Sequence, residues 1–162
     1  MEKFIKLWIV HVEKTRIVLL VTLEVPENRV KITNAVNDLM QNQVDIGNTF
    51  KNSKGMDFAK TVTKLLKEHI AIAADILSDL VNEDNVKLGE DMMKWDENAD
   101  KISSAFGEDK IKFHMYNHLD FTFREFQSEV LGNRDLSIMF YDKALMHIKT
   151  MATDLYPFTK KS

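Results

Sequence analysis

The stretch DFAKTVTKLLKEHIAIAADILSDLV, residues 57–81, decides the fold class. Its apolar side chains recur at intervals of three and four residues, which collects them on one face of an α-helix, at Leu66, Ile70, Ala73, Leu77 and Leu80. Such a helix would be about 37 Å long. Because only one of its faces is apolar, other helices have to cover that face. The stretch therefore predicts a bundle of helices.

The same periodicity predicts five further helices on either side of this stretch, at residues 3–23, 27–40, 86–104, 110–131 and 135–156. Pro26, residues 82–85 and Gly132 separate neighbouring helices with turn and cap chemistry. Residues 17–23 also have the composition of a β-strand, but a lone strand would have no partner. A helix is therefore expected there as well.

The sequence pattern that predicts a helix is weaker for two of the six segments than for the other four. The helix at 27–40 is short and breaks near 42–47, and the helix at 86–104 contains Gly89, which costs about 1 kcal/mol relative to alanine. Short connections favour antiparallel packing of neighbouring helices. We therefore expect one domain over residues 1–162, an all-α antiparallel helical bundle with four long core helices plus two shorter or broken ones.

Composition and charge exclude several functions. The chain has no cysteine, which rules out disulfides, iron–sulfur clusters and thiolate zinc sites and favours a cytoplasmic location. Its net charge of -3 gives no positive field that would attract nucleic acid. Charged residues interrupt the apolar stretch at 4–23, so neither a membrane span nor a signal peptide is expected there. A protein partner or a homo-oligomer stays open.

The motifs of common helical enzymes are missing from the sequence. It has no glycine-rich phosphate loop, no His-Glu-x-x-His pair and no EF-hand loop. The Glu-x-x-His pair of ferritin-like di-iron bundles and the spacings of hemerythrin-like sites do not occur either. Whether the protein is an enzyme is left open by these absences.

Four histidines fall on four different predicted helices: His11, His69, His118 and His147. Reflecting the sequence through a connecting turn identifies which residues of two antiparallel helices lie at the same height. The turn near 133 sets His118 opposite His147 or its neighbour, and the turn near 83 sets His69 opposite Glu97 and Asn98. These residues are therefore expected in one middle layer of the bundle.

The first helix is placed in the layer in the same way. Reflection through Pro26 sets His11 level with about Leu39, within about two residues, or 3 Å, for each loop. The fifth and sixth helices, reflected through their own turn, set Glu125 opposite the hydroxyl of Tyr141. Arg16 is expected to form an ordinary salt bridge.

Two interpretations of this layer stay open. Neutral imidazoles and carboxylates from different helices are ligands of divalent metals, so a Zn, Fe or Mn site is one hypothesis. Its ligands would be His11, His69, His118, His147 and Glu125. The His114-x-x-x-His118 spacing adds a weaker chelating pair.

The preferred interpretation is a buried hydrogen-bonded network without metal. Thr15, Thr122, Asn98, Glu125 and Tyr141 offer enough polar groups to satisfy every imidazole. The corresponding function is a non-catalytic binding or interaction module that acts on a protein partner or a small ligand. The alternative is a metal-binding helical-bundle protein, with metal-dependent catalysis as a further hypothesis.

Motifs along nearly the whole chain carry a resemblance to a family. They are Leu7-Trp8-x-x-His11-Val12-x-x-Thr15-Arg16, Asn42-x-x-Asp45-Ile46-Gly47, Leu65-Leu66-Lys67-Glu68-His69-Ile70, Lys94-Trp95-x-x-Asn98-Ala99-Asp100, Tyr116-x-His118-Leu119-x-x-Thr122-x-x-Glu125, and Tyr141-Asp142 followed by His147-Ile148-x-x-Met151-Ala152-x-Asp154. In these the chain resembles uncharacterised small all-helical proteins common in spore-forming bacteria. Its lysine- and asparagine-rich composition also fits a large DNA virus.

The chain departs from this family at several places. Lys14 replaces a tryptophan, and residues 52–56 lack a tyrosine–glycine pair. His114 lies outside the pattern, which weakens the chelating-pair hypothesis. The resemblance therefore implies shared positions for four histidines and implies no particular chemistry.

Overall fold

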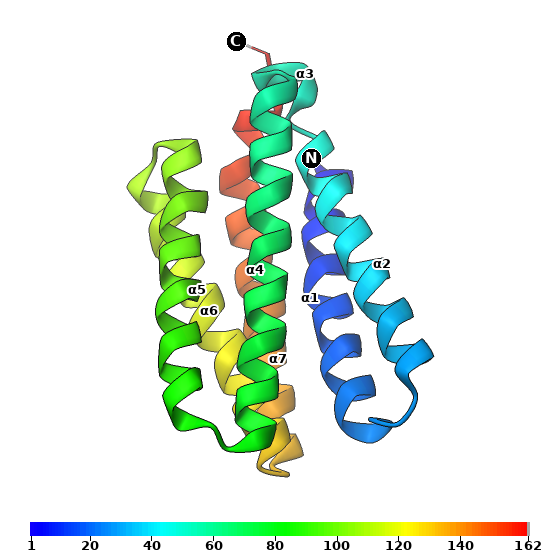
Figure 1. The fold of residues 1–162 in the computed structure, drawn as a ribbon. Helices are drawn as coiled ribbons and strands as arrows, with labels where there is room; N and C mark the ends of the chain where they lie inside the picture. Colours follow the sequence, from blue (N-terminus) through cyan, green and yellow to red (C-terminus); the bar gives the residue numbers. More distant parts are fainter. Residues whose placement is uncertain (162) are drawn as a thin grey trace.

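The computed structural model describes residues 1–161, which form helices and no strands. The helices are α1 (Glu2–Glu24), α2 (Arg29–Asn48), α3 (Lys51–Lys54), α4 (Met56–Asn82), α5 (Asn85–Phe106), α6 (Asp109–Val130) and α7 (Arg134–Leu155), followed by the 3₁₀ turn η1 (Tyr156–Thr159). The long helices run alternately down and up, so each is antiparallel to the next (Figure 1). The predicted all-α antiparallel bundle is confirmed.

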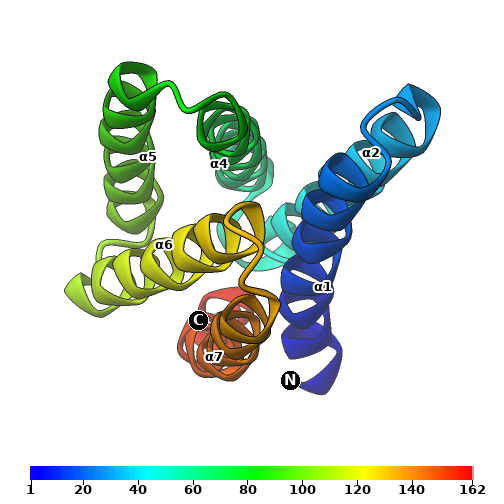
Figure 2. The same ribbon diagram turned by 90° about the horizontal axis from the view of Figure 1, so that it is seen from below.

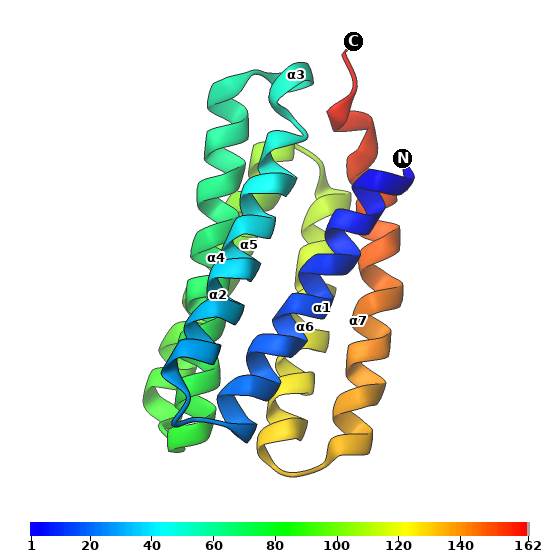
Figure 3. The same cartoon turned by 90° about the vertical axis from the view of Figure 1, so that its right-hand side faces the viewer.

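The helices are arranged as two hairpins on either side of a central helix. Viewed from below, α6 lies between the α4–α5 hairpin and the α1–α2 hairpin, and α7 packs beside α6 and α1 (Figure 2). The turns α1–α2, α4–α5 and α6–α7 lie at the lower end of the bundle (Figure 3). Both termini lie at the opposite, upper end, together with α3. No helix in residues 1–161 is long and apolar enough to cross a membrane.

The two helices that were expected to be shorter or broken are continuous. Helix α2 extends through residues 42–47 to Asn48, and α5 spans 22 residues despite Gly89. The amide groups in this segment bond to main-chain carbonyls, since Asn42 donates to Leu7 of α1 and Gln43 donates to Leu39. Between α2 and α4, residues 51–54 form the single turn α3.

Helix ends follow ordinary capping chemistry. Asn28, Asp84 and Asn133 each accept a hydrogen bond from the main-chain N–H three residues later, at the starts of α2, α5 and α7. Gly107 ends α5 in the left-handed backbone conformation, with φ of 70°. A residue with a Cβ adopts this conformation only at a cost in free energy. These caps fix the short turns that keep consecutive helices antiparallel.

The upper end of the bundle is closed by aromatic rings. Phe50 lies in edge contact with Phe4, Phe58 and Phe106, at centroid separations of 5.9, 5.8 and 5.3 Å, and Phe158 of η1 adds a further contact with Phe106. Aromatic pairs of this geometry stabilise a core by about 0.5–1.5 kcal/mol beyond their buried area. This cluster joins α1, α4 and α5 to the connection between α2 and α3, which contains Phe50, and to η1, which contains Phe158.

Helices α2 and α4 approach closely just below this cluster. A Cβ placed on Gly47 would overlap Thr63 Oγ1 and lie 3.0 Å from the carbonyl oxygen of Ala59. Gly47 is buried, and Ile46 beside it is fully buried. A glycine is therefore required at this position for the observed packing, and it fixes the height of Gln43 one turn earlier in α2.

Candidate functional site

Three imidazoles from three helices meet in the middle of the bundle: His11 of α1, His69 of α4 and His118 of α6. Their side chains are buried, with residue exposures of 3 %, 3 % and 4 %. The Nε2 atoms of His11 and His118 lie 3.4 Å apart, and the rings of His69 and His118 stack with centroids 5.9 Å apart. We call these residues the three-histidine cluster.

Side-chain amides and an indole surround the cluster. Nε2 of Gln43 lies 3.2 Å from Nδ1 of His11, and Oδ1 of Asn98 lies 3.1 Å from Nδ1 of His69. The ring of the fully buried Trp95 lies against His69, with centroids 5.1 Å apart. The predicted pairing of His69 with Asn98 is therefore confirmed, whereas His11 bonds to Gln43, one turn further along α2 than the expected Leu39.

The hydrogen bonds of the amides determine which ring nitrogens carry protons. Asn98 donates through Nδ2 to the carbonyl of Leu65, so its oxygen accepts from the Nδ1–H of His69. Gln43 donates through Nε2 to the carbonyl of Leu39, so Nδ1 of His11 acts as an acceptor and its proton is on Nε2.

The tautomer of His11 then fixes that of its neighbour. His11 donates to Nε2 of His118, which places the His118 proton on Nδ1. Within residues 1–161, this buried Nδ1 has no hydrogen-bond partner. An unpaired buried donor of this kind costs about 1–3 kcal/mol.

Burial keeps all three imidazoles neutral. Desolvation, aided by the proximity of His69, lowers the pKa of His11 to about 3, and desolvation lowers that of His69 to about 4 against a partly opposing hydrogen bond that His69 donates to Asn98. The pKa of His118 is also lowered well below its usual range by burial and by the neighbouring imidazoles. The cluster is therefore an uncharged polar core at neutral pH.

His147 does not join the cluster. It lies one turn away, beside His114 of α6, with Nε2 at 3.4 Å from His114 Nδ1 and 3.1 Å from the His114 carbonyl oxygen. Nε2 of His114 lies 2.8 Å from the carboxylate of Asp154, which also pairs with Lys110 at 2.6 Å. Burial lowers the pKa of the half-buried His147, whose surroundings are less enclosed than those of the cluster.

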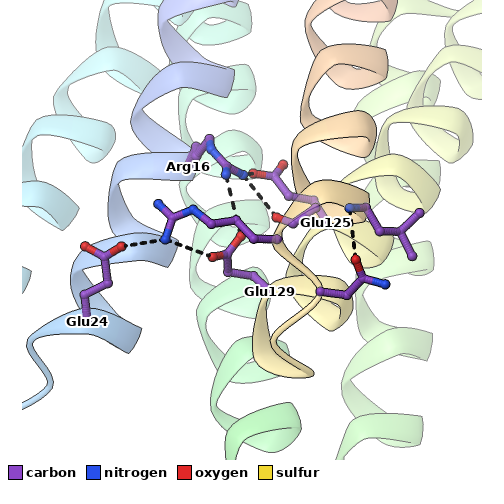
Figure 4. Close-up of polar contacts among 8 residues, drawn as sticks. Arg16, Glu24, Glu125 and Glu129 are labelled. Atoms are coloured by element: carbon purple, nitrogen blue, oxygen red, sulfur yellow. Dashed lines mark hydrogen bonds and ion pairs between the residues drawn. The ribbon is translucent and has the colours of Figure 1, made fainter.

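Glu125 also lies apart from the cluster, two helical turns along α6 from His118, or about 10 Å. Its carboxylate receives a hydrogen bond of 2.8 Å from Arg16 of α1, which also donates to Ser137 of α7 at 3.2 Å (Figure 4). Arg16 lies 3.6 Å from Glu129, and Arg134 bridges Glu129 and Glu24 at 3.9 and 3.3 Å. We call Arg16, Glu125 and Glu129 the arginine network.

The arginine network is almost as enclosed as the histidines. The side chains of Arg16, Glu125 and Glu129 are 11 %, 2 % and 9 % exposed. Burial raises the pKa of Glu125 to about 7, although Arg16 opposes the shift. Glu125 therefore carries a proton for part of the time at neutral pH.

Tyr141 of α7 also contacts Arg16 and is not hydrogen-bonded to Glu125. The guanidinium carbon of Arg16 lies 4.9 Å from the centre of the Tyr141 ring, on the ring face. The expected contact between Glu125 and the Tyr141 hydroxyl is therefore replaced by a shared contact with Arg16. The sequence provided no way to pair α1 with α6 and α7, because these helices are not neighbours in the chain.

The predicted metal ligands thus separate into three places: the three-histidine cluster, the His114–His147 pair and the arginine network. Within residues 1–161, no group of three or more histidine, aspartate or glutamate side chains surrounds a common point as the ligands of a metal ion would. Gln43 and Asp154 take part in these sites although the sequence did not indicate them, and His114 pairs with His147 instead of chelating with His118. The four-residue spacing from His114 to His118 was the one available signal.

A half-open groove separates the α1–α2 hairpin from α4 in the lower half of the bundle. Its inner part, of about 330 Å³, ends at Leu39, Ile70 and Phe126, and is bordered by Thr15. Its outer part, of about 410 Å³, opens at the lower end beside Pro26, Arg29 and Asn82. Val18, Val36, Ala74 and Leu77 line both parts, so the two parts adjoin along α1, α2 and α4.

The inner end of the groove reaches the polar interior. Thr15 lines the groove, and its hydroxyl donates to the carbonyl oxygen of His11 at 2.9 Å. The groove therefore ends one helical turn from the three-histidine cluster.

Comparison with known proteins gives no relative for this chain. No protein-family model matches it, and no curated protein and no solved structure is significantly similar to it. A function is therefore argued from the side chains themselves.

Proposed function

We propose that the protein is a non-catalytic binding module that holds a small apolar ligand in the groove between the α1–α2 hairpin and α4. The observation that carries the proposal is the groove itself, with its apolar walls and its volumes of about 330 and 410 Å³. Ligand pockets of proteins are mostly apolar and have volumes of roughly 300–1,000 Å³.

The histidine cluster supports the walls of this groove in the proposal. Its polar groups bond α1 to α2 through His11 and Gln43, and α4 to α5 through His69 and Asn98. These bonds fix the register of the helices within each hairpin, and α1, α2 and α4 form the walls of the groove. A buried polar layer also specifies one register of the helices, because a slip would leave further buried polar groups unpaired.

Binding of a neutral apolar dye tests the proposal. Nile red is expected to bind with one site per chain and to become strongly fluorescent in the groove. Ala74→Phe places a ring in the groove from an exposed position of α4, and should abolish this signal without loss of folding. Thr33→Phe adds the same ring at an exposed position of α2 outside the groove, and should leave the signal unchanged. Equal dye binding by all three proteins contradicts the proposal.

A metal ion held by His11 and His118 is the second candidate. Two nitrogens bound to one tetrahedral zinc at 2.0–2.1 Å lie about 3.4 Å apart, and the two Nε2 atoms have this separation. The absence of a complete ligand group in residues 1–161 weighs against this candidate.

Metal content decides between the two functions. Protein prepared without a histidine tag and without chelator is expected to contain far less than one equivalent of zinc, iron or manganese. Near-stoichiometric metal that is lost in His118→Ala and kept in His147→Ala would establish the metal site and leave the histidines with more than a supporting role.

A further inference from the structure

We infer that the ligand of the groove is a free long-chain carboxylic acid, with its carboxylate beside Arg29 and its alkyl chain directed toward Phe126. The inference rests on the proposed function and names the chemical class of the ligand. It is carried by the length of the groove, by the separation of its apolar and polar linings, and by the placement of its charged residues.

The groove has the length of one alkyl chain. Along α2 its lining extends from Arg29 to Met40, a rise of about 16 Å over eleven residues. An acyl chain in one leaflet of a membrane spans about half of the 30 Å hydrocarbon core, or about 15 Å. A single extended chain of that kind therefore fills the groove from end to end, whereas an α-helix of about 10–12 Å diameter is too thick for its volume.

Polar residues are more numerous in the outer part of the groove than in the inner part, where Thr15 and Asp75 are the polar lining residues. Its inner end is formed by Leu39, Ile70 and Phe126. The outer part is bordered by Thr22, Arg29, Ser78 and Asn82, which are absent from the inner lining. A ligand with one polar end would therefore bind with that end outward and its apolar end inward.

The charged residues that line the groove indicate whether the polar end of the ligand is anionic or cationic. Arg29 is the one charged residue that lines the outer part, it is exposed, and it forms no ion pair within residues 1–161. It is also the first residue of α2, where the helix dipole favours an anion. Asp75, the one charged residue of the inner part, lies seven residues from Asn82 along α4, about 10 Å from the open end. A carboxylate is thus attracted at the open end and repelled further in.

Displacement of bound Nile red by monomeric amphiphiles tests the inference. Dodecanoate is expected to displace the dye more effectively than dodecanol, and dodecanol more effectively than dodecyltrimethylammonium. Shortening the chain to octanoate should weaken binding by about fourfold for each methylene removed. Lengthening it beyond the groove should bring no further gain.

Variants separate the head group from the chain. Arg29→Gln should weaken dodecanoate binding by about three- to tenfold, as expected for one partly exposed charge-assisted contact, and leave dodecanol binding unchanged. Arg29→Lys should restore most of the loss. Lys31→Gln removes a neighbouring exposed charge outside the groove lining and should have no effect.

The outcomes distinguish the inference from the function on which it rests. If the dye binds in the groove but the alcohol and the ammonium compete as well as the acid, or if Arg29→Gln changes nothing, the carboxylic acid is wrong and the binding module stands. If the dye does not bind, or if Ala74→Phe does not affect its binding, both the binding module and the carboxylic acid ligand are contradicted. If the acid binds only as part of vesicles, seen as co-flotation of the protein, a membrane surface replaces the free acid.

Discussion

The three-histidine cluster and the arginine network are both buried polar regions that join α1 to α6, but they satisfy their polar groups in opposite ways. In the cluster, amides and imidazoles exchange hydrogen bonds and no group carries a charge. In the arginine network, Arg16 faces the carboxylates of Glu125 and Glu129. The comparison shows that a single bundle can hold neutral and ionic polar cores two helical turns apart.

This difference determines how each region responds to a change. Removing one partner of a buried ion pair leaves an unpaired charge, which costs more than the loss of one neutral hydrogen bond. Acidification acts differently on the two regions, because it charges the imidazoles of the cluster and neutralises the carboxylates of the arginine network.

The largest effect is expected from Arg16→Met, which removes the partner of Glu125. The free energy of unfolding at pH 7.5, measured by urea titration, should fall by about 3–5 kcal/mol. Arg124→Met is the matched control, since Arg124 also bonds a carboxylate, that of Asp120, at 2.8 Å, but in an exposed i,i+4 pair. Its loss should be about 0.5 kcal/mol or less. Similar losses in the two variants would show that the arginine network is not the stronger region.

The second prediction concerns the cluster and pH. A histidine whose folded pKa lies near 3 or 4 and whose unfolded pKa is 6.5 contributes stability that is complete above pH 6.5 and is lost as the pH falls. Between pH 7 and pH 5 each such histidine loses about 2 kcal/mol. Glu125, with its pKa raised to about 7, binds a proton more tightly when folded and opposes this loss by about the same amount.

His11 and His69 both lose stability in this way, and the pKa of His118 is also lowered well below its usual range, so the wild-type protein should lose stability on acidification from pH 7 to pH 5. His69→Gln should make this decline smaller by about 2 kcal/mol, as seen in urea titrations at the two pH values. His147→Gln, at a half-buried position outside the cluster, should reduce it by less. An unchanged slope in His69→Gln would mean that His69 can take up a proton in the folded protein.

The third prediction tests how the cluster depends on helix approach. Gly47→Ala should force α2 away from Thr63 and cost about 1–2 kcal/mol, the cost of overpacking less the gain in helix propensity. It should also disturb the bond between Gln43 and His11, which would appear as a shift in the His11 imidazole resonances. Gly89→Ala, with open space around its Cβ, should instead stabilise the protein by about 0.5–1 kcal/mol.

The sequence predicted the all-α fold and the neighbours of consecutive helices, because periodicity and short turns determine both. His69 and Asn98 face each other as expected, since the turn between α4 and α5 is tight. Between α1 and α2, His11 contacts Gln43, one helical turn beyond the predicted Leu39, and His147 bonds to His114 instead of His118. Both differences arise because a small change in the geometry of a turn displaces a helix along its axis.

The arginine network could not be predicted in this way. Arg16 and Glu125 are 109 residues apart, on helices joined by no direct turn. Their contact depends on the order in which the hairpins surround α6, and neither hydrophobic periodicity nor capping residues determine that order. Apolar faces of comparable composition allow more than one arrangement of hairpins, so buried pairs across the bundle become visible only in three dimensions.

The smallest expected effect concerns Tyr141, which contacts the arginine network through its ring. Tyr141→Phe keeps the ring face 4.9 Å from the Arg16 guanidinium and removes a hydroxyl that makes no hydrogen bond with Glu125, so stability should change by less than about 0.5 kcal/mol. Tyr141→Leu removes the ring and should cost about 0.5–1 kcal/mol from the cation–π contact. In the Arg16→Met background, Tyr141→Phe and Tyr141→Leu should lower the free energy of unfolding by more similar amounts, because the cation that contacts the ring is absent. A double-mutant cycle measures this coupling. If Tyr141→Phe costs as much as Tyr141→Leu in the wild-type background, the hydroxyl and not the ring stabilises the network, and the pairing of Tyr141 with Glu125 expected from the sequence is restored.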